Sequence, residues 1–171
     1  MLARNEVIFK WVLYGAATAL CFLFQGGLFQ RIPLLGVIPF IYPMLAAIPA
    51  TFEAPAPAGI FALCLGVFCD LLLPDAFPCL YTLVFPAVGI CASIISQKLL
   101  PAGFRCSLVV SAAAFLLTDL FRCLILSASG HSAVWGTGLL LLLKEFLVSA
   151  PLLIPLTLLY RTVARKVHTF D

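Results

Sequence analysis

Charged side chains are scarce in this 171-residue sequence. Asp, Glu, Lys and Arg make up 10% of the residues, whereas a soluble domain usually carries about a quarter. A disordered chain or a nucleic-acid-binding domain needs far more charge, and the net charge of +3 is too small to attract a nucleic acid. The composition therefore excludes both classes.

Closely spaced cysteines are also missing. The seven cysteines are scattered, mostly within apolar runs, and no two of them form a CxxC pair. A zinc site or a secreted disulfide framework requires clustered cysteines. We therefore interpret these residues as small packing side chains and expect no metal and no cofactor. They are Cys21, Cys64, Cys69, Cys79, Cys91, Cys106 and Cys123.

Hydrophobic residues, by contrast, form 64% of the chain, and the mean hydropathy is +1.18. A membrane-spanning helix requires about 20 residues, so the chain has room for about six spans with little left for loops. We predict an all-α polytopic membrane protein whose six transmembrane helices form one bundle, a single integral membrane domain over residues 1–171. Uncharged windows place the spans at about 11–30, 32–52, 58–73, 79–97, 106–127 and 134–160.

Basic residues orient these spans. Six spans put both termini on one side of the membrane, and seven Lys or Arg residues lie on that side. The opposite side has Arg31 and, near a helix end, Arg122. Because cytoplasmic loops carry the excess of positive charge, we expect both termini in the cytoplasm. The seven residues are Arg4, Lys10, Lys98, Arg105, Arg161, Arg165 and Lys166.

Four prolines interrupt the second span. Pro33, Pro39, Pro43 and Pro49 lie within one span length, and each interior proline removes a backbone hydrogen bond and clashes with the preceding turn. Irregular backbone at membrane depth is tolerated only where protein or a wet cavity covers it. We therefore expect this element to be bent and packed among its neighbours.

Five charged residues within the spans are the candidate functional residues. A charge inside a bilayer costs about 2.5–3.5 kcal/mol on insertion scales, so such residues are usually paired or functional. The topology gives the five similar depths, and three acids nearly balance two bases. The favoured interpretation is a buried charge network that fixes helix register, and a site for a polar ligand or an ion is the alternative. The residues are Asp70, Asp119, Arg122, Lys144 and Glu145.

Small residues recur at every fourth position in the third span. Ala58, Ala62 and Gly66 form one helix-packing ridge that continues to Asp70. Small residues at this spacing let helices approach closely, so the ridge brings Asp70 to a helix–helix contact. We expect most such ridges to pack against the protein's own helices.

The sequence carries no enzyme signature. Asp70 and Asp119 could form an aspartyl dyad like that of signal peptidase II, but the Asn- and Gly-containing motifs of that family are missing. Ser129-Gly130-His131 lies in a short outer loop without an orienting acid nearby. We therefore expect a protein without catalytic activity.

Several segments together resemble a known family. A short turn at Gln30-Arg31 precedes the proline-bearing span, which ends at Phe52-Glu53. The third span reads Gly59-Ile-Phe-Ala-Leu-Cys-Leu-Gly66-Val-Phe-Cys-Asp70, and the fourth begins Leu80-Tyr-Thr-Leu. In length, span count and tail charge the whole chain resembles the rod shape-determining MreD family, and the Gly66-x-x-x-Asp70 segment is the most specific part.

This resemblance implies a non-enzymatic subunit of the bacterial cell-elongation machinery in the cytoplasmic membrane. Members of the family accompany an MreC-like bitopic membrane protein, a RodA-type glycan polymerase with its transpeptidase and, indirectly, actin-like MreB. Together these proteins direct lateral peptidoglycan synthesis and hence cell shape. A partner's transmembrane helix would dock within the lipid bilayer on a small-residue or proline-bent face.

The family is also similar in fold to the substrate-binding membrane subunits of energy-coupling-factor vitamin transporters, which gives an alternative function. A vitamin site needs several convergent hydrogen-bonding groups. The outer halves of the spans offer few such groups besides the five charges, so the sequence favours the scaffold. The available groups are Gln25, Gln30, Thr82, Ser127 and His131.

Overall fold

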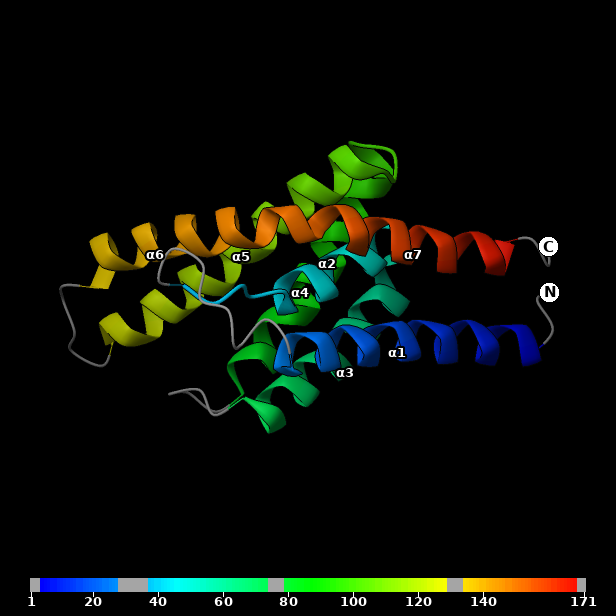
Figure 1. Cartoon of the computed structure of the whole chain (residues 1–171), viewed down its shortest axis with the longest axis horizontal. Helices are drawn as coiled ribbons and strands as arrows, with labels where there is room; N and C mark the ends of the chain where they lie inside the picture. Colours follow the sequence, from blue (N-terminus) through cyan, green and yellow to red (C-terminus); the bar gives the residue numbers. More distant parts are fainter. Residues whose placement is uncertain (1–3, 28–36, 74–78, 129–133, 169–171) are drawn as a thin grey trace.

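The structure is a computed structural model that describes residues 4–27, 37–73, 79–128 and 134–168. These ranges are almost entirely helical (Figure 1), which confirms the all-α prediction. The expected outer turns around Arg31, Pro74 and Ser129 lie outside the described residues. The elements are α1 (Arg4–Gly27), α2 (Tyr42–Ala50), α3 (Pro55–Leu72), α4 (Leu80–Lys98), α5 (Phe104–Ala128), α6 (Val134–Ser149), the short 3-10 helix η2 (Ala150–Leu152) and α7 (Leu153–His168).

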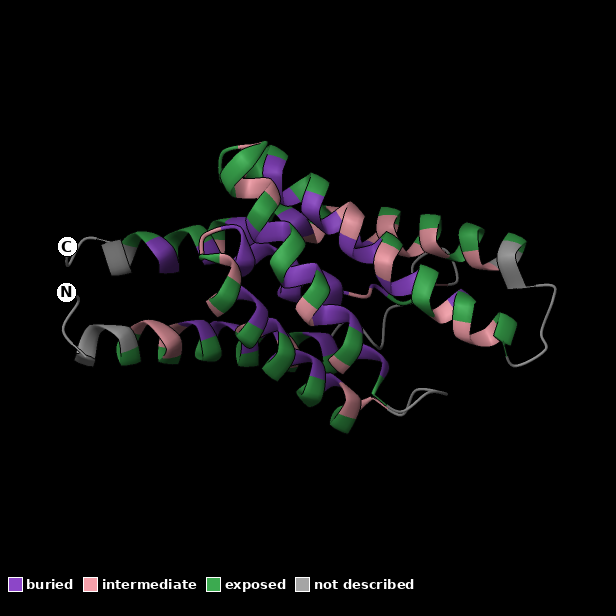
Figure 2. Ribbon diagram, turned by 180° about the vertical axis from the view of Figure 1, so that it is seen from behind, coloured by how far each residue is buried: buried purple, intermediate pink, exposed green. Residues whose placement is uncertain are grey.

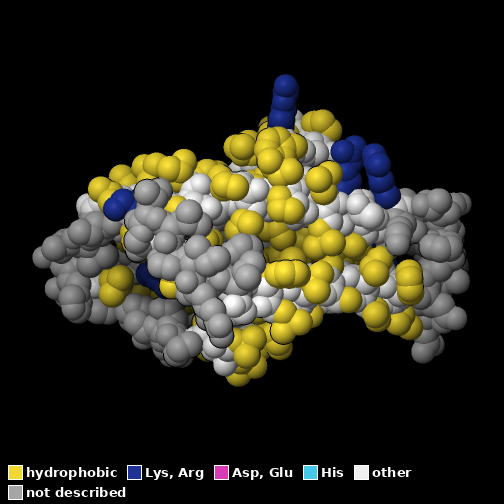
Figure 3. All heavy atoms as spheres, in the orientation of Figure 1, with side chains coloured by type: hydrophobic (Ala, Val, Ile, Leu, Met, Phe, Trp, Pro, Cys, Tyr) yellow, Lys and Arg dark blue, Asp and Glu magenta, His cyan; other side chains and the backbone are white. Residues whose placement is uncertain are grey.

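Five segments of the described chain are long and apolar enough to cross a membrane. Hydrophobic side chains cover much of the visible surface of the described residues (Figure 3), as expected of a multi-pass membrane protein. The start of α1 and the end of α7 lie at the same end of the molecule's long axis (Figure 1). The segments are Ile8–Gly27, Pro55–Leu72, Leu80–Lys98, Phe104–Ala128 and Gly138–Arg165.

The second expected span is not one spanning helix. In its described part, residues 37–41 are non-helical and only the nine residues of α2 are helical. Nine residues rise about 13 Å, less than half of a hydrocarbon core. Prolines set both limits, because Pro43 lies in the first turn of α2, where its missing N–H costs nothing, and Pro49 lies at the last turn.

Helix α2 is the centre of the molecule. All nine of its residues are buried, and Met44, Leu45 and Ile48 are fully buried. Helices α3, α4, α5 and α7 pack around it, and buried residues gather in the middle of the molecule (Figure 2). The expectation that neighbouring helices cover the proline-bent element is therefore confirmed for its described part.

The last expected span is a long rod made of α6, η2 and α7. The 3-10 turn Ala150–Leu152 contains Pro151 and follows directly from α6, as expected for a helix interrupted by proline. The rod runs along most of the molecule, with α5 beside its first part and α1 beside its second (Figure 1). It therefore connects two groups of helices.

Helices α3 and α4 form the closest-packed pair, joined along the predicted ridge. Ala58, Ala62 and Gly66 are all buried. A Cβ atom added to Gly66 would lie 2.5 Å from the carbonyl oxygen of Tyr81, and one added to Gly89 would lie 2.8 Å from Cβ of Ala62. Small residues on both helices therefore allow this approach, and the ridge packs inside the protein.

Candidate functional site

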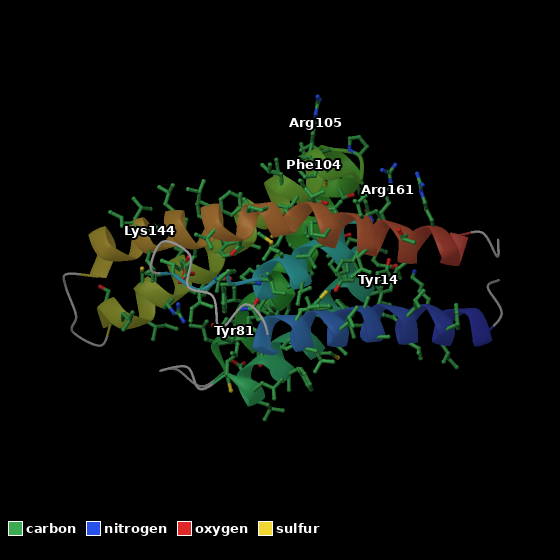
Figure 4. All side chains as sticks on the ribbon, viewed as in Figure 1. Tyr14, Tyr81, Phe104, Arg105, Lys144 and Arg161 are labelled. Carbon is green, nitrogen blue, oxygen red and sulfur yellow. The ribbon has the colours of Figure 1, made fainter. Side chains whose placement is uncertain are left out.

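Asp70 binds the first turn of α4. Its Oδ1 accepts a hydrogen bond from the backbone N–H of Tyr81 at 3.1 Å, and its Oδ2 accepts bonds from the N–H and the hydroxyl of Thr82 at 2.8 and 2.5 Å. The N-cap residue Cys79 has a left-handed backbone, with φ of 64°, and its side chain makes no capping bond to the described residues. The carboxylate of α3 therefore caps α4 in place of a local N-cap residue. Figure 4 labels Tyr81, which lies in this first turn of α4.

The Gly66-x-x-x-Asp70 segment now has a physical explanation. Gly66 has no side chain, so the backbone of Tyr81 can lie against α3 one helical turn before Asp70. That approach brings the first amides of α4 within reach of the carboxylate. The positive end of the α4 dipole then partly compensates the charge of Asp70 inside the membrane.

A second group of charged residues lies between α5 and α6. Asp119 is 8% exposed and interacts electrostatically with Arg122, one turn further along α5. Glu145 of α6 interacts electrostatically with both of them. The guanidinium of Arg122 thus interacts with two carboxylates. Asp119 Oδ2 is buried without a hydrogen-bond partner among the described residues.

A small pocket of about 140 Å³ opens beside Asp119. Its remaining lining is apolar apart from Cys123, whose sulfur would lie 2.6 Å from a Cβ on Gly138. Gly138 therefore permits the close approach of α6 to α5. The pocket residues are Leu116, Asp119, Leu120, Cys123, Gly138, Leu139 and Leu142.

Lys144 differs from the other four charged residues because it is exposed on α6 (Figure 4). It makes no hydrogen bond or ion pair with the part of the chain that the structure describes. The contacts therefore group the five residues differently from the single network that the sequence predicts. Asp70 bonds to α4, three residues interact between α5 and α6, and Lys144 points away from them.

The similar level of the five residues stays a prediction from residue counting along the helices. Asp70 follows Glu53 by 17 residues, and Lys144 precedes Arg161 by 17, which is about 25 Å of helix in each case. Asp119 follows Arg105 by 14 residues, or about 21 Å. This level is nearer to the side opposite the chain termini than to the termini themselves.

A polar cluster at the other end of the bundle was not predicted from the sequence. Lys10 Nζ lies 2.6 Å from Glu53 Oε1 and donates a hydrogen bond to Oε2, also at 2.6 Å. The backbone carbonyl of Glu53 accepts a bond of 2.6 Å from Ser93 Oγ, and that of Thr51 accepts one of 2.6 Å from Ser96 Oγ. These contacts tie α1 and α4 to the turn between α2 and α3. The only sequence signal is that Lys10 precedes one uncharged stretch of the sequence and Glu53 ends another.

Three further hydrogen bonds of polar side chains support the central elements. The hydroxyls of Thr18 and Tyr160 lie 2.9 Å apart and join α1 to α7. Gln25 donates to the carbonyl of Pro39 at 2.5 Å, and Ser149 accepts from the N–H of Phe40 at 2.9 Å. The last two bonds satisfy backbone groups of the non-helical segment before α2, as a dry interior requires.

The described residues offer no recognisable metal or cofactor site. No three His, Cys, Asp or Glu side chains within them are grouped so as to hold a metal ion. A larger groove of about 270 Å³ lies between α1 and α7, and its lining is apolar. The arrangement can hold helices together and present apolar faces.

Comparison with known proteins gives no relative: no family model, no curated protein and no solved structure matches this chain.

Proposed function

We propose that this chain is a non-enzymatic membrane subunit of the bacterial cell-elongation machinery, which regulates cell shape and lateral peptidoglycan synthesis by binding partner proteins. The partners are an MreC-like bitopic protein and a RodA-type glycan polymerase with its transpeptidase. The proposal starts from the resemblance of the sequence to the MreD family. One structural observation supports it: the residues that carry the resemblance make their contacts within the protein's own helices.

The distinctive residues of this chain serve its own architecture. Asp70 caps α4, Gly66 allows the α3–α4 approach, and the prolines bound the buried helix α2. Such a framework is typical of a rigid scaffold that leaves its outer faces to lipid and partner helices. Because the small-residue ridge and α2 are both covered by the chain itself, a partner must dock on another face than the two that the sequence suggests.

The alternative, a substrate-binding subunit of an energy-coupling-factor vitamin transporter, has less support. Ligand pockets usually have volumes of about 300–1,000 Å³ with several convergent polar groups. In the described part of the chain the α1–α7 groove has about 270 Å³ and is apolar, and the Asp119 pocket has about 140 Å³. Asp119 Oδ2 is the observation that favours a ligand, since it is a buried acceptor without a described partner.

Affinity purification from native membranes in mild detergent, followed by mass spectrometry, tests the two functions. We expect an MreC-like protein or the wall polymerase to co-purify with the tagged chain, and we expect rod-shaped host cells depleted of the chain to become round. Recovery of a transporter coupling protein with its ATPases, without wall proteins and with cell shape unchanged, would support the vitamin transporter instead.

A further inference from the structure

Lys144 is an exposed charge on an otherwise apolar helix face. Exposed residues recur at alternating spacings of four and three positions from Leu140 to Leu158, over about 27 Å of helix. That length is close to the thickness of the hydrocarbon core. We define the rod face by six exposed residues of α6, η2 and α7: Leu140, Lys144, Leu147, Pro151, Ile154 and Leu158.

The rod face belongs to the span that the protein itself covers least. In the Gly138–Arg165 segment, 17% of the hydrophobic window is buried, compared with 28–44% in the other four segments. Helix α6 packs mainly against α5, and Gly138 and Leu142, which are not part of the rod face, lie at that contact. Leu140, Leu147 and Leu158 are each more than half exposed. The described part of the chain therefore leaves this face open to a neighbour in the membrane.

The charge of Lys144 indicates the chemistry of that neighbour. A lysine facing hydrocarbon costs about 2.5–3.5 kcal/mol on insertion scales. The neighbouring carboxylates of Asp119 and Glu145 interact with Arg122 and form no ion pair with Lys144. A carboxylate from outside the described chain would compensate this ammonium group.

We propose that the rod face binds one transmembrane helix of a partner protein that carries an Asp or Glu at the level of Lys144. Alternating spacings of three and four residues are those of left-handed helix packing at about 20°, the usual arrangement in membrane bundles. An acidic lipid headgroup would contact only the ammonium group of Lys144. A partner helix would also pack against the leucines on either side of it. This inference deepens the proposed function and rests on it for the partner's identity.

Photo-crosslinking in the native host tests the inference with the full chain. A photoreactive phenylalanine analogue replaces Leu147 on the rod face or, as a matched control, Leu83, which is 71% exposed on α4. We expect a protein adduct from Leu147 but not from Leu83, and its crosslinked span should contain Asp or Glu. Lys144→Leu should lower the adduct yield about tenfold, in line with about 1–2 kcal/mol for an interhelical polar contact.

Two further variants separate charge pairing from folding. Lys144→Arg should keep the adduct, and Lys144→Glu should lose it until the partner's acid is changed to lysine. Because the Lys144 side chain is exposed and makes no hydrogen bond or ion pair with the described residues, we expect all these variants to accumulate normally. Adducts with lipid only, with a second copy of this chain or with a span that has no acid overturn the inference, as does an unchanged yield with Lys144→Leu.

The outcomes also separate this inference from the proposed function. If wall proteins co-purify but Leu147 yields no acid-bearing span, the scaffold function stands and the docking face is wrong. If Leu147 crosslinks to an acid-bearing span of a protein unrelated to wall synthesis, the docking face stands and the proposed function is wrong.

Discussion

Asp70 and Thr82 join the end of α3 to the start of α4 through two hydrogen bonds, from the amide of Thr82 at 2.8 Å and from its hydroxyl at 2.5 Å. A residue from one helix thus does what an N-cap residue normally does within the helix that it caps. The capped helix also packs along the ridge that carries Asp70. Capping and packing therefore depend on each other in this hairpin.

Replacing Asp70 by leucine should destabilise the α3–α4 hairpin. The change removes the acceptor of three hydrogen bonds, two of them from backbone amides in the first turn of α4. A lost cap costs about 0.5–2 kcal/mol, and buried unpaired amides cost more. Thermal unfolding in detergent measures the loss, and Thr82→Val, which removes only the hydroxyl bond, should cost less. Equal melting temperatures for Asp70→Leu and the wild type would contradict the capping role.

Gly66→Ala should be destabilising, although alanine normally stabilises a helix by about 1 kcal/mol relative to glycine. The added methyl group would lie 2.5 Å from a backbone carbonyl of α4, which cannot move without separating the two helices. Gly15→Ala on α1 is the matched control, since nothing lies within 4 Å of its added Cβ. Thermal unfolding should show the Gly66 variant below the wild type and the Gly15 variant at or above it. Parallel shifts of the two variants would show that the close approach is not limiting.

Sequence reasoning predicts the fold where one physical rule dominates. Hydropathy finds the long spans because hydrocarbon requires about 20 apolar residues, and the spacing of Ala58, Ala62 and Gly66 identifies an internal packing face. It does not predict that the second span shortens to the nine residues of α2. That outcome depends on Gln25 and Ser149, distant residues that satisfy the backbone next to α2.

Asp119 and Arg122 should respond very differently to replacement. Arg122→Leu leaves the carboxylates of Asp119 and Glu145 without their shared cation, and removing one partner of a fully buried charge pair costs about 3–5 kcal/mol, so we expect a loss of up to that size at this half-buried site. Asp119→Leu leaves the Glu145–Arg122 pair intact and removes an oxygen without a described partner, so we expect a change within about 1 kcal/mol. Thermal aggregation in detergent, measured without chemical denaturant, can compare the stabilities of the two variants. A large loss with Asp119→Leu would instead favour a ligand held by that carboxylate.

The candidate site is predicted only in part, for a reason that individual residues make clear. Sequence identifies intramembrane charges because each is costly, and it places the five at one level. It cannot assign their partners, because these depend on helix rotation. Asp70 faces the α4 terminus and Glu145 faces α5. Lys144 faces outward, although it directly precedes Glu145 in the chain.

The ion pair between Lys10 and Glu53 should fasten α1 to the turn between α2 and α3. Its side chains are 21% and 9% exposed, so water screens it only in part. We expect Lys10→Met or Glu53→Gln to lower stability by about 1 kcal/mol, toward the upper end of exposed pairs. The exchange of both residues, Lys10→Glu with Glu53→Lys, should restore part of the loss, because the backbone carbonyl of Glu53 that accepts from Ser93 is retained. A double-mutant cycle of melting temperatures in detergent measures the coupling, and additive effects of the two single changes would mean that the contact contributes nothing to stability.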